Sequence, residues 1–274
     1  MSAFEAIVLG LLQGITEFLP ISSTGHLKLL PWALHWQSFP SRSLENTFDV
    51  ALHVGTFVAV IAYFRHDVVR LAAAAWASLR ERSLAGKPER KLAWMVVVSS
   101  IPAAIAGVAL EDFVESRLGQ PLVIAAAMVG VALLLWAGEL WTGKRRPLEA
   151  AGWWDAIGVG CAQVLALVPG TSRSGITILA GLVGGLTREA AARYSFLISI
   201  PIIAGAAAAK GAKLLSGGIP PGFALPFALG IAASALSGMV AIAFLLRWLR
   251  TRTLYPFIIY RLAVGTALLV LLLR

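Results

Sequence analysis

Long apolar runs, separated by short charged stretches, follow one another along the whole chain. About 20 apolar residues in a helix cross the hydrocarbon core of a bilayer. Six runs of roughly that length each predict a transmembrane helix: 48–64, 92–110, 121–141, 193–215, 223–246 and 254–273. Residues 68–82 predict a further helix that lies in the membrane interface. We therefore expect an all-α polytopic membrane protein with six transmembrane helices.

Two other apolar stretches, 3–34 and 153–187, are interrupted near their middle by proline and then by hydroxyl residues. The first interruption reads EFLPISSTGHLKLL and the second reads LALVPGTSRSGITIL. Each half of a stretch is long enough for about half a bilayer. Irregular backbone occurs at membrane depth only where protein or a water-filled cavity surrounds it. We expect each stretch to form a broken re-entrant helical hairpin.

The two interrupted stretches repeat each other. Gly10 and Gln13 recur as Gly160 and Gln163, and SSTG recurs as SRSG, both with an offset of 150 residues. Each half of the chain then holds one hairpin followed by three spans. Because three is odd, the second half is inverted relative to the first, and the hairpins can meet near the midplane. The inverted-topology repeats are expected at about 1–141 and 153–274.

Composition and charge support one integral membrane domain over residues 1–274. Of the side chains, 58% are hydrophobic and only 14% are charged, too few to cover a soluble core of this size. The net charge is +9. Basic residues cluster between the spans, where Lys and Arg mark cytoplasmic loops, so both termini are expected to face outward. This clustering accounts for the basic charge without nucleic-acid binding.

Polar residues gather at the two interruptions. Gln13 and Glu17 are one helical turn apart, and Ser23 and His26 also share a helix face. Arg173 stands between two serines in the second interruption. Ionisable groups at membrane depth are costly and indicate a functional site. Helix N-termini bind anions and arginine grips phosphate with two nitrogens, so we expect a phosphate-binding cavity that contains Glu17, His26 and Arg173.

The remaining polar groups within apolar runs have a structural interpretation. We expect Asp49 and His53 to be interfacial or helix-packing groups, and Glu139 either to snorkel toward the interface or to pair with a loop cation. Arg261 is expected to pair with a neighbouring helix. The two interruptions differ from these groups because two independent kinks would not share residues at one offset.

The segments QGITEFLPISSTGH at 13–26 and PGTSRSGIT at 169–177 resemble the two signature segments of the undecaprenyl-diphosphate phosphatase family, the bacitracin-resistance proteins. The resemblance covers essentially the whole chain. It implies an enzyme of the bacterial inner membrane that hydrolyses undecaprenyl diphosphate to undecaprenyl phosphate and inorganic phosphate. That activity recycles the lipid carrier of peptidoglycan synthesis and confers bacitracin resistance. The resemblance also implies a divalent cation, Mg²⁺ or Ca²⁺, a site open to the outer side, and a possible homodimer.

The resemblance assigns residues as well. The family's first pattern is Glu or Gln followed four residues later by Glu, and here Gln13 and Glu17 fill it, with an amide at the first position. The expected catalytic residues are Glu17, Ser23, His26 and Arg173, and Glu17 is also the expected metal ligand. The expected substrate-binding residues are Gln13, Ser22, Thr24, Gly170, Thr171, Ser172, Ser174 and Thr177.

Two mechanisms and a different function stay open. Ser23 attacks the terminal phosphorus while His26 relays the proton, or water activated by Glu17 or His26 attacks directly. The alternative function is a transporter or flippase of a phosphorylated polyprenyl lipid, because inverted repeats with broken midplane helices are typical of transporters. The run SSTGH also resembles the PSGH motif of lipid acid phosphatases, but the second His and the Asp expected of them are missing.

Overall fold

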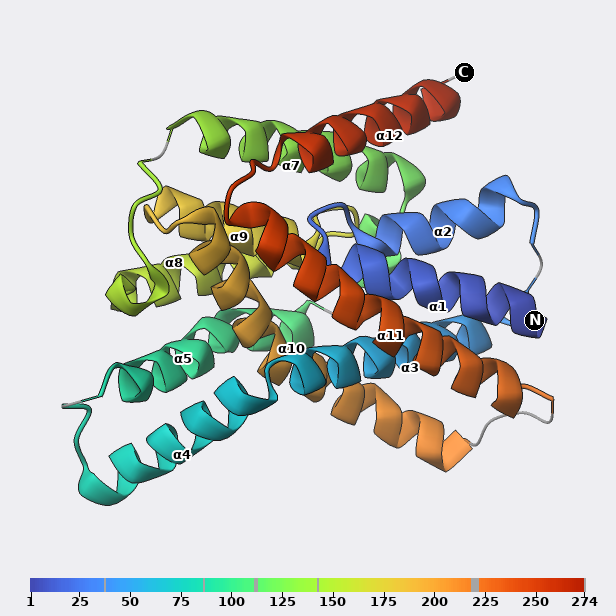
Figure 1. Cartoon of the computed structure of the whole chain (residues 1–274). Coiled ribbons are helices and arrows are strands. Elements are labelled where there is room, and N and C mark those ends of the chain that lie inside the picture. The colour runs from blue at the N-terminus through green and yellow to red at the C-terminus, as the bar shows by residue number, and fades with distance from the viewer. Residues whose placement is uncertain (37, 86, 111–112, 142, 218–221, 274) are drawn as a thin grey trace.

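The computed structural model describes all residues except 37, 86, 111–112, 142, 218–221 and 274, and leaves the side chains of 115–116 and 209–217 undescribed. Its described part contains eleven α-helices packed into one bundle (Figure 1). In chain order they are α1 (Ala3–Phe18), α2 (Ser23–Ala33), α3 (Arg42–Tyr63), α4 (Arg65–Glu81), α5 (Pro88–Ala109), α7 (Pro121–Trp141), α8 (Trp153–Val164), α9 (Arg173–Val183), α10 (Arg188–Gly217), α11 (Ala224–Leu249) and α12 (Tyr255–Leu273).

Six helices are long and apolar enough to cross a membrane, which confirms the predicted number: α3, α5, α7, α10, α11 and α12. Their ends differ from the predicted spans where a cap lies outside the apolar run. Helix α3 begins at Arg42 rather than at residue 48, because the Ser41 side chain accepts a hydrogen bond from the Leu44 N–H. The extra helix predicted at 68–82 is α4. Two segments between predicted spans lie partly outside the described residues: 111–120, before the span at 121–141, and 217–222, before the span at 223–246.

Both interrupted stretches are broken helix pairs. Helix α1 ends at Phe18, and α2 then runs back beside it (Figure 1). Helix α8 is followed by a short 3₁₀ turn, Leu165–Leu167, and by α9, which packs on α8. The N-caps of α2 and α9 are Ser22 and Ser172, both with a positive φ, 77° and 71°. Each serine accepts a hydrogen bond from a glycine N–H three residues later, so the two breaks have the same local geometry.

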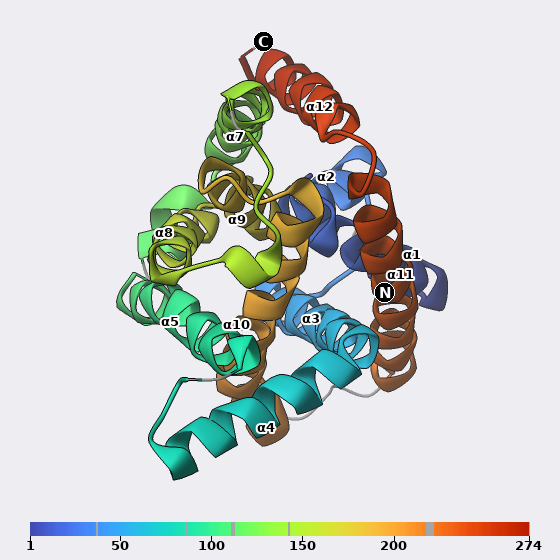
Figure 2. The ribbon, with the colours of Figure 1, turned by 60° about the vertical axis from the view of Figure 1, so that its left-hand side comes forward.

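Small residues bring the helices around the first break into close contact. Helix α1 packs on α11, where Gly10 meets the main chain of Gly230 and Gly14 meets Ser237. Such contacts let helix backbones approach closely within a membrane. Helix α9 is surrounded by α7, α8 and α10 (Figure 2). The two breaks are thereby held facing each other inside the bundle.

Candidate active site

A cavity of about 230 Å³ lies between the two breaks. Its polar lining comes from the first break, from α3 and from the second break: Thr16, Glu17, Ser22, Ser23, Thr24, His53, Gln163, Gly170, Ser172 and Arg173. Its apolar lining comes from α5, from the 3₁₀ turn with the two residues after it, and from α10. In that order the residues are Ala103; Ala166, Leu167, Val168 and Pro169; and Ile202, Ile203 and Ala206. The cavity therefore combines a polar region with an apolar wall.

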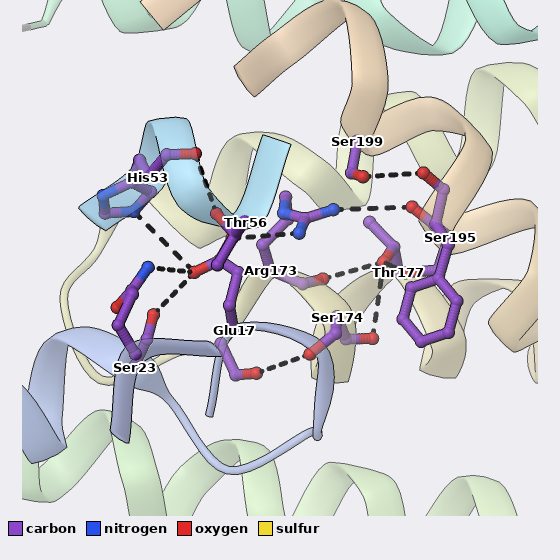
Figure 3. Close-up of polar contacts among 12 residues, drawn as sticks. Glu17, Ser23, His53, Thr56, Arg173, Ser174, Thr177, Ser195 and Ser199 are labelled. Atoms are coloured by element: carbon purple, nitrogen blue, oxygen red, sulfur yellow. Dashed lines mark hydrogen bonds and ion pairs between the residues drawn. The ribbon is translucent and has the colours of Figure 1, made fainter. Parts of the chain in front are cut away.

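Glu17 is the centre of the polar region (Figure 3). Arg173 Nη2 lies 3.0 Å from Glu17 Oε1, which joins the two halves of the chain by an ion pair. The other carboxylate oxygen, Oε2, accepts hydrogen bonds from Ser23 Oγ at 2.9 Å and Gln13 Nε2 at 3.2 Å. The side chains of Glu17 and Arg173 are 8% and 11% exposed. These contacts bring together three of the four expected catalytic residues, Glu17, Ser23 and Arg173.

The hydroxyl groups of the second break hold Arg173 in place. Ser174 Oγ donates to the Leu19 carbonyl at 3.0 Å and so ties the second break to the first. Thr177 Oγ1 donates to the Arg173 carbonyl at 2.7 Å and lies 2.6 Å from Ser195 Oγ. Ser174 and Thr177 are buried behind the cavity, as Thr171 is, and Gln13 is also absent from the described lining. The remaining expected binding residues line the cavity: Ser22, Thr24, Gly170 and Ser172. The buried hydroxyls thus support the site from outside the cavity.

His26 lies apart from Ser23 Oγ. Its Nδ1 is 2.6 Å from the Ser22 carbonyl oxygen, so Nδ1 carries the proton and donates it. Its Nε2 is 2.6 Å from the Tyr260 hydroxyl, and the two rings stack with their centroids 5.5 Å apart. Both ring nitrogens are therefore engaged outside the cavity. The structure does not place His26 to receive a proton from Ser23.

His53, rather than His26, is the histidine that lies beside Glu17 in the cavity. It lines the cavity, and its Nε2 is 3.7 Å from Glu17 Oε2. Its Nδ1 donates to the Asp49 carbonyl at 2.7 Å, which turns Nε2 toward the carboxylate. The interpretation of His53 as an interfacial or packing group is wrong. The sequence offered one signal for a functional role, because His53 is an ionisable residue inside a predicted span. The apolar run around His53 does not show which helix its side chain faces.

Arg261 is the second residue whose contact with the site was not predicted from the sequence. It is fully buried on α12, and its guanidinium donates to carbonyls of both breaks, Pro20 at 3.2 Å and Gly170 at 2.9 Å. It also donates to Met128 of α7 at 3.2 Å, so the expected pairing with a neighbouring helix is confirmed in part. A guanidinium offers five donors in a fixed plane. Arg261 therefore ties both breaks to one helix and places a positive charge behind them.

The expectation that Glu139 pairs with a cation is confirmed. Glu139 pairs with Arg188 at 2.6 Å and with Lys144 at 3.1 Å, so it is bound by cations as predicted. These contacts connect the end of α7 to the start of α10, and they lie outside the cavity lining.

A divalent cation held by the protein alone does not fit this donor set. Both oxygens of Glu17 already accept hydrogen bonds, and Arg173 places a positive charge beside them. Among the described residues, no group of three His, Cys, Asp or Glu side chains could hold a metal ion. Mg²⁺ usually binds through one or two carboxylates, with water and substrate phosphates as its other ligands. Such a cation would depend on the substrate for most of its ligands.

Gly170 shapes the second break, and its replacement tests that geometry. Its φ is +95°, and a β-carbon there would overlap the main chain of Ile124 in α7. We expect Gly170→Ala to lower the free energy of unfolding by more than about 2 kcal/mol, measured in detergent, because strain and overlap add. Gly130→Ala is the matched control, since a β-carbon on Gly130 meets open space. Equal stability of both variants would contradict the geometry of this break.

Comparisons with known proteins place the chain in a family. The family described as bacitracin resistance protein BacA matches residues 6–267. A protein of Trichlorobacter lovleyi named undecaprenyl-diphosphatase is 48% identical, over 99% of this chain and 98% of its own length. Proteins of the same name from Pelobacter propionicus and Myxococcus xanthus are 46% and 45% identical, over 97% and 99% of this chain and 96% and 90% of their own lengths. The chain belongs to the bacitracin resistance protein BacA family.

Proposed function

We propose that the protein hydrolyses undecaprenyl diphosphate to undecaprenyl phosphate and inorganic phosphate in the bacterial inner membrane. The observation that carries this proposal is the meeting of Arg173, Glu17 and Ser23 in one cavity between two helix N-termini. The name undecaprenyl-diphosphatase of the relatives agrees with that chemistry. Recycling of the lipid carrier for peptidoglycan synthesis, and resistance to bacitracin, follow from this activity.

The cavity binds the two ends of the substrate differently. Arg173 and the first N–H groups of α2 and α9 bind the diphosphate, because unpaired N–H groups at a helix start attract anions. Arg261 adds positive charge from behind the breaks. The apolar wall formed by Ile202, Ile203 and Ala206 of α10 accommodates the first part of the polyprenyl tail.

Ser23 is the nucleophile of the main route. Its hydroxyl donates to Glu17, so the proton moves to that carboxylate as Oγ bonds to the terminal phosphorus. The bond from that phosphorus to the bridging oxygen breaks, and the lipid monophosphate leaves with the proton from Glu17, which returns Glu17 to its charged form. Water then releases phosphate from Ser23. Direct attack by water, with Glu17 as its base, is the second route that this geometry supports.

A divalent cation brought in by the diphosphate would neutralise phosphate charge when bound. Among the described residues of the cavity lining, Glu17 is the one carboxylate that would approach it.

The broken pairs act as re-entrant hairpins of two inverted repeats, and the cavity opens to the outer side. The helix contacts support the repeat. In the two halves α1 corresponds to α8, and α5 corresponds to α11. The contact of α1 with α11 is accordingly matched by a contact of α8 with α5. Helices α3 and α10 also correspond to each other, as do α7 and α12, and the two helices of each pair are in contact. Labelling of cysteines placed at the two ends of the bundle from either side of a sealed vesicle tests the orientation.

Purified protein in detergent tests the proposed activity. The protein should release phosphate from undecaprenyl diphosphate, and a chelator should slow that release. Detergent has no two compartments, so release there separates hydrolysis from transport. Ser23→Ala should lower kcat by at least about 100-fold by the covalent route, and acid quenching of the wild type should trap phosphate on Ser23. Full activity of Ser23→Ala would exclude the covalent route.

A further inference from the structure

Gln163 repeats Gln13 in the second half of the chain, and the proposed function gives it no role. It belongs to α8, lines the cavity and is 2% exposed. Its Nε2 donates to the Ser99 carbonyl of α5 at 3.3 Å. Because a carbonyl oxygen only accepts, the amide nitrogen must face Ser99, and this fixes the orientation of the amide. Oε1 then points away from Ser99.

The Oε1 atom of Gln163 is a buried acceptor whose donor is not among the described residues. Burying such an acceptor without a donor is unfavourable, because no hydrogen bond compensates for the lost contact with water. An ionised diphosphate and an isoprenoid chain offer no donor. Arg173, the charged donor of the cavity lining, already donates to Glu17 and to the Ser195 carbonyl. Water is the donor that this reaction brings into the cavity.

We propose that Gln163 Oε1 holds and orients the water that attacks phosphorus. This inference rests on the proposed function but is independent of the route. One hydrogen of the water stays hydrogen-bonded to Oε1 while the water oxygen bonds to phosphorus, and the other proton passes to Glu17. In the covalent route the bond from phosphorus to Ser23 Oγ breaks, and Glu17 returns the proton to Oγ. In the direct route the bond to the bridging oxygen breaks, and the proton stays on Glu17 until the product leaves.

The two glutamines of the repeat thus have different tasks. Gln13 Oε1 also lacks a donor among the described residues, but Gln13 Nε2 donates to Glu17 Oε2 and Gln13 is absent from the described cavity lining. It orients the carboxylate that handles the proton. Gln163 faces the cavity from the opposite half of the chain and orients the water. One motif, repeated at an offset of 150 residues, supplies one positioning group for the base and one for the nucleophile.

Gln163→Leu removes the acceptor and keeps a similar volume. We expect kcat to fall about 100-fold, because a misplaced nucleophile costs a factor of that order. By the direct route KM should stay within about twofold because the substrate loses no contact, whereas by the covalent route KM should fall together with kcat. By the covalent route, rapid acid quenching should find phosphate accumulated on Ser23. Gln13→Leu is the matched control: it impairs Glu17 and slows phosphorylation of Ser23 as well, so it should not raise the phosphoserine level. Gln163→Glu keeps an oxygen acceptor and should retain kcat within about tenfold, with a raised KM from the added charge.

Wild-type protein assayed in parallel distinguishes a failure of the proposed function from a failure of the role proposed for Gln163. If the wild type releases no phosphate, the proposed function fails. If it does, and Gln163→Leu keeps the wild-type kcat or changes KM alone, the water-orienting role of Gln163 is refuted. Should Gln163→Leu not fold, as judged by its thermal transition, Gln163→Glu decides. A kcat within about tenfold of wild type supports the proposal, and a larger loss contradicts it.

Discussion

Replacing Arg173 with methionine lowers kcat for phosphate release by about 1,000-fold, which corresponds to about 4 kcal/mol of transition-state stabilisation. Arg173 is the one arginine among the described residues that line the cavity, and its side chain is 11% exposed. In so apolar a setting a bidentate contact with phosphate is stronger than in water. Methionine keeps much of the volume and removes the charge. Phosphate release by purified protein in detergent measures the effect.

The exposed pair of Arg250 and Glu189 offers a matched control. These side chains are 65% and 36% exposed and lie 2.8 Å apart, outside the cavity lining. Arg250→Met removes the same charge as Arg173→Met, yet it should leave kcat within about twofold, because exposed ion pairs contribute little. If Arg173→Met folds and turns over at the wild-type rate, the site has been placed in the wrong cavity.

Replacing Glu17 with glutamine has the second large effect, a fall in kcat of about 100- to 10,000-fold with little change in KM. Glutamine keeps the shape but cannot take the proton from Ser23 or from water. Arg173 loses its counter-charge and stays free to bind the diphosphate, which protects KM. Steady-state kinetics in detergent, with Glu189→Gln as the control, measures both parameters. A rise in KM at unchanged kcat would mean that Glu17 binds substrate rather than handling the proton.

The double variant adds a test of the ion pair. Residues that act as one unit give non-additive losses, so Glu17→Gln with Arg173→Met should cost much less activity than the product of the two single effects. The small activity losses of Arg250→Met and Glu189→Gln should add in the double variant, as expected for an exposed pair. Additive losses for the buried pair would indicate that Glu17 and Arg173 act in separate steps.

The sequence predicted the helices well because the bilayer imposes a length of about 20 apolar residues on each span. It also located both breaks, since Ser22 and Ser172 stand at equivalent positions of the repeat and cap the following helices. Helix ends were less predictable. Helix α3 extends through polar residues to Arg42, and no apolar pattern marks that extension.

The partners of the site residues could not be read from the sequence. Ser23 and His26 share a helix face by spacing, yet Ser23 turns to Glu17 while His26 turns to Tyr260 of α12. Which of two neighbouring side chains faces a cavity depends on the packing of distant helices. The same holds for His53 and Arg261, which reach the breaks from α3 and α12.

A structure of the protein with a methylene-bridged analogue of undecaprenyl diphosphate shows whether the diphosphate binds between the two breaks. We expect the terminal phosphonate within hydrogen-bond distance of Arg173 and beside Ser23 Oγ. The first isoprene unit should lie along Ile203 and Ala206. A phosphonate bound outside this cavity, with Arg173 still paired only with Glu17, would mean that the substrate site lies elsewhere.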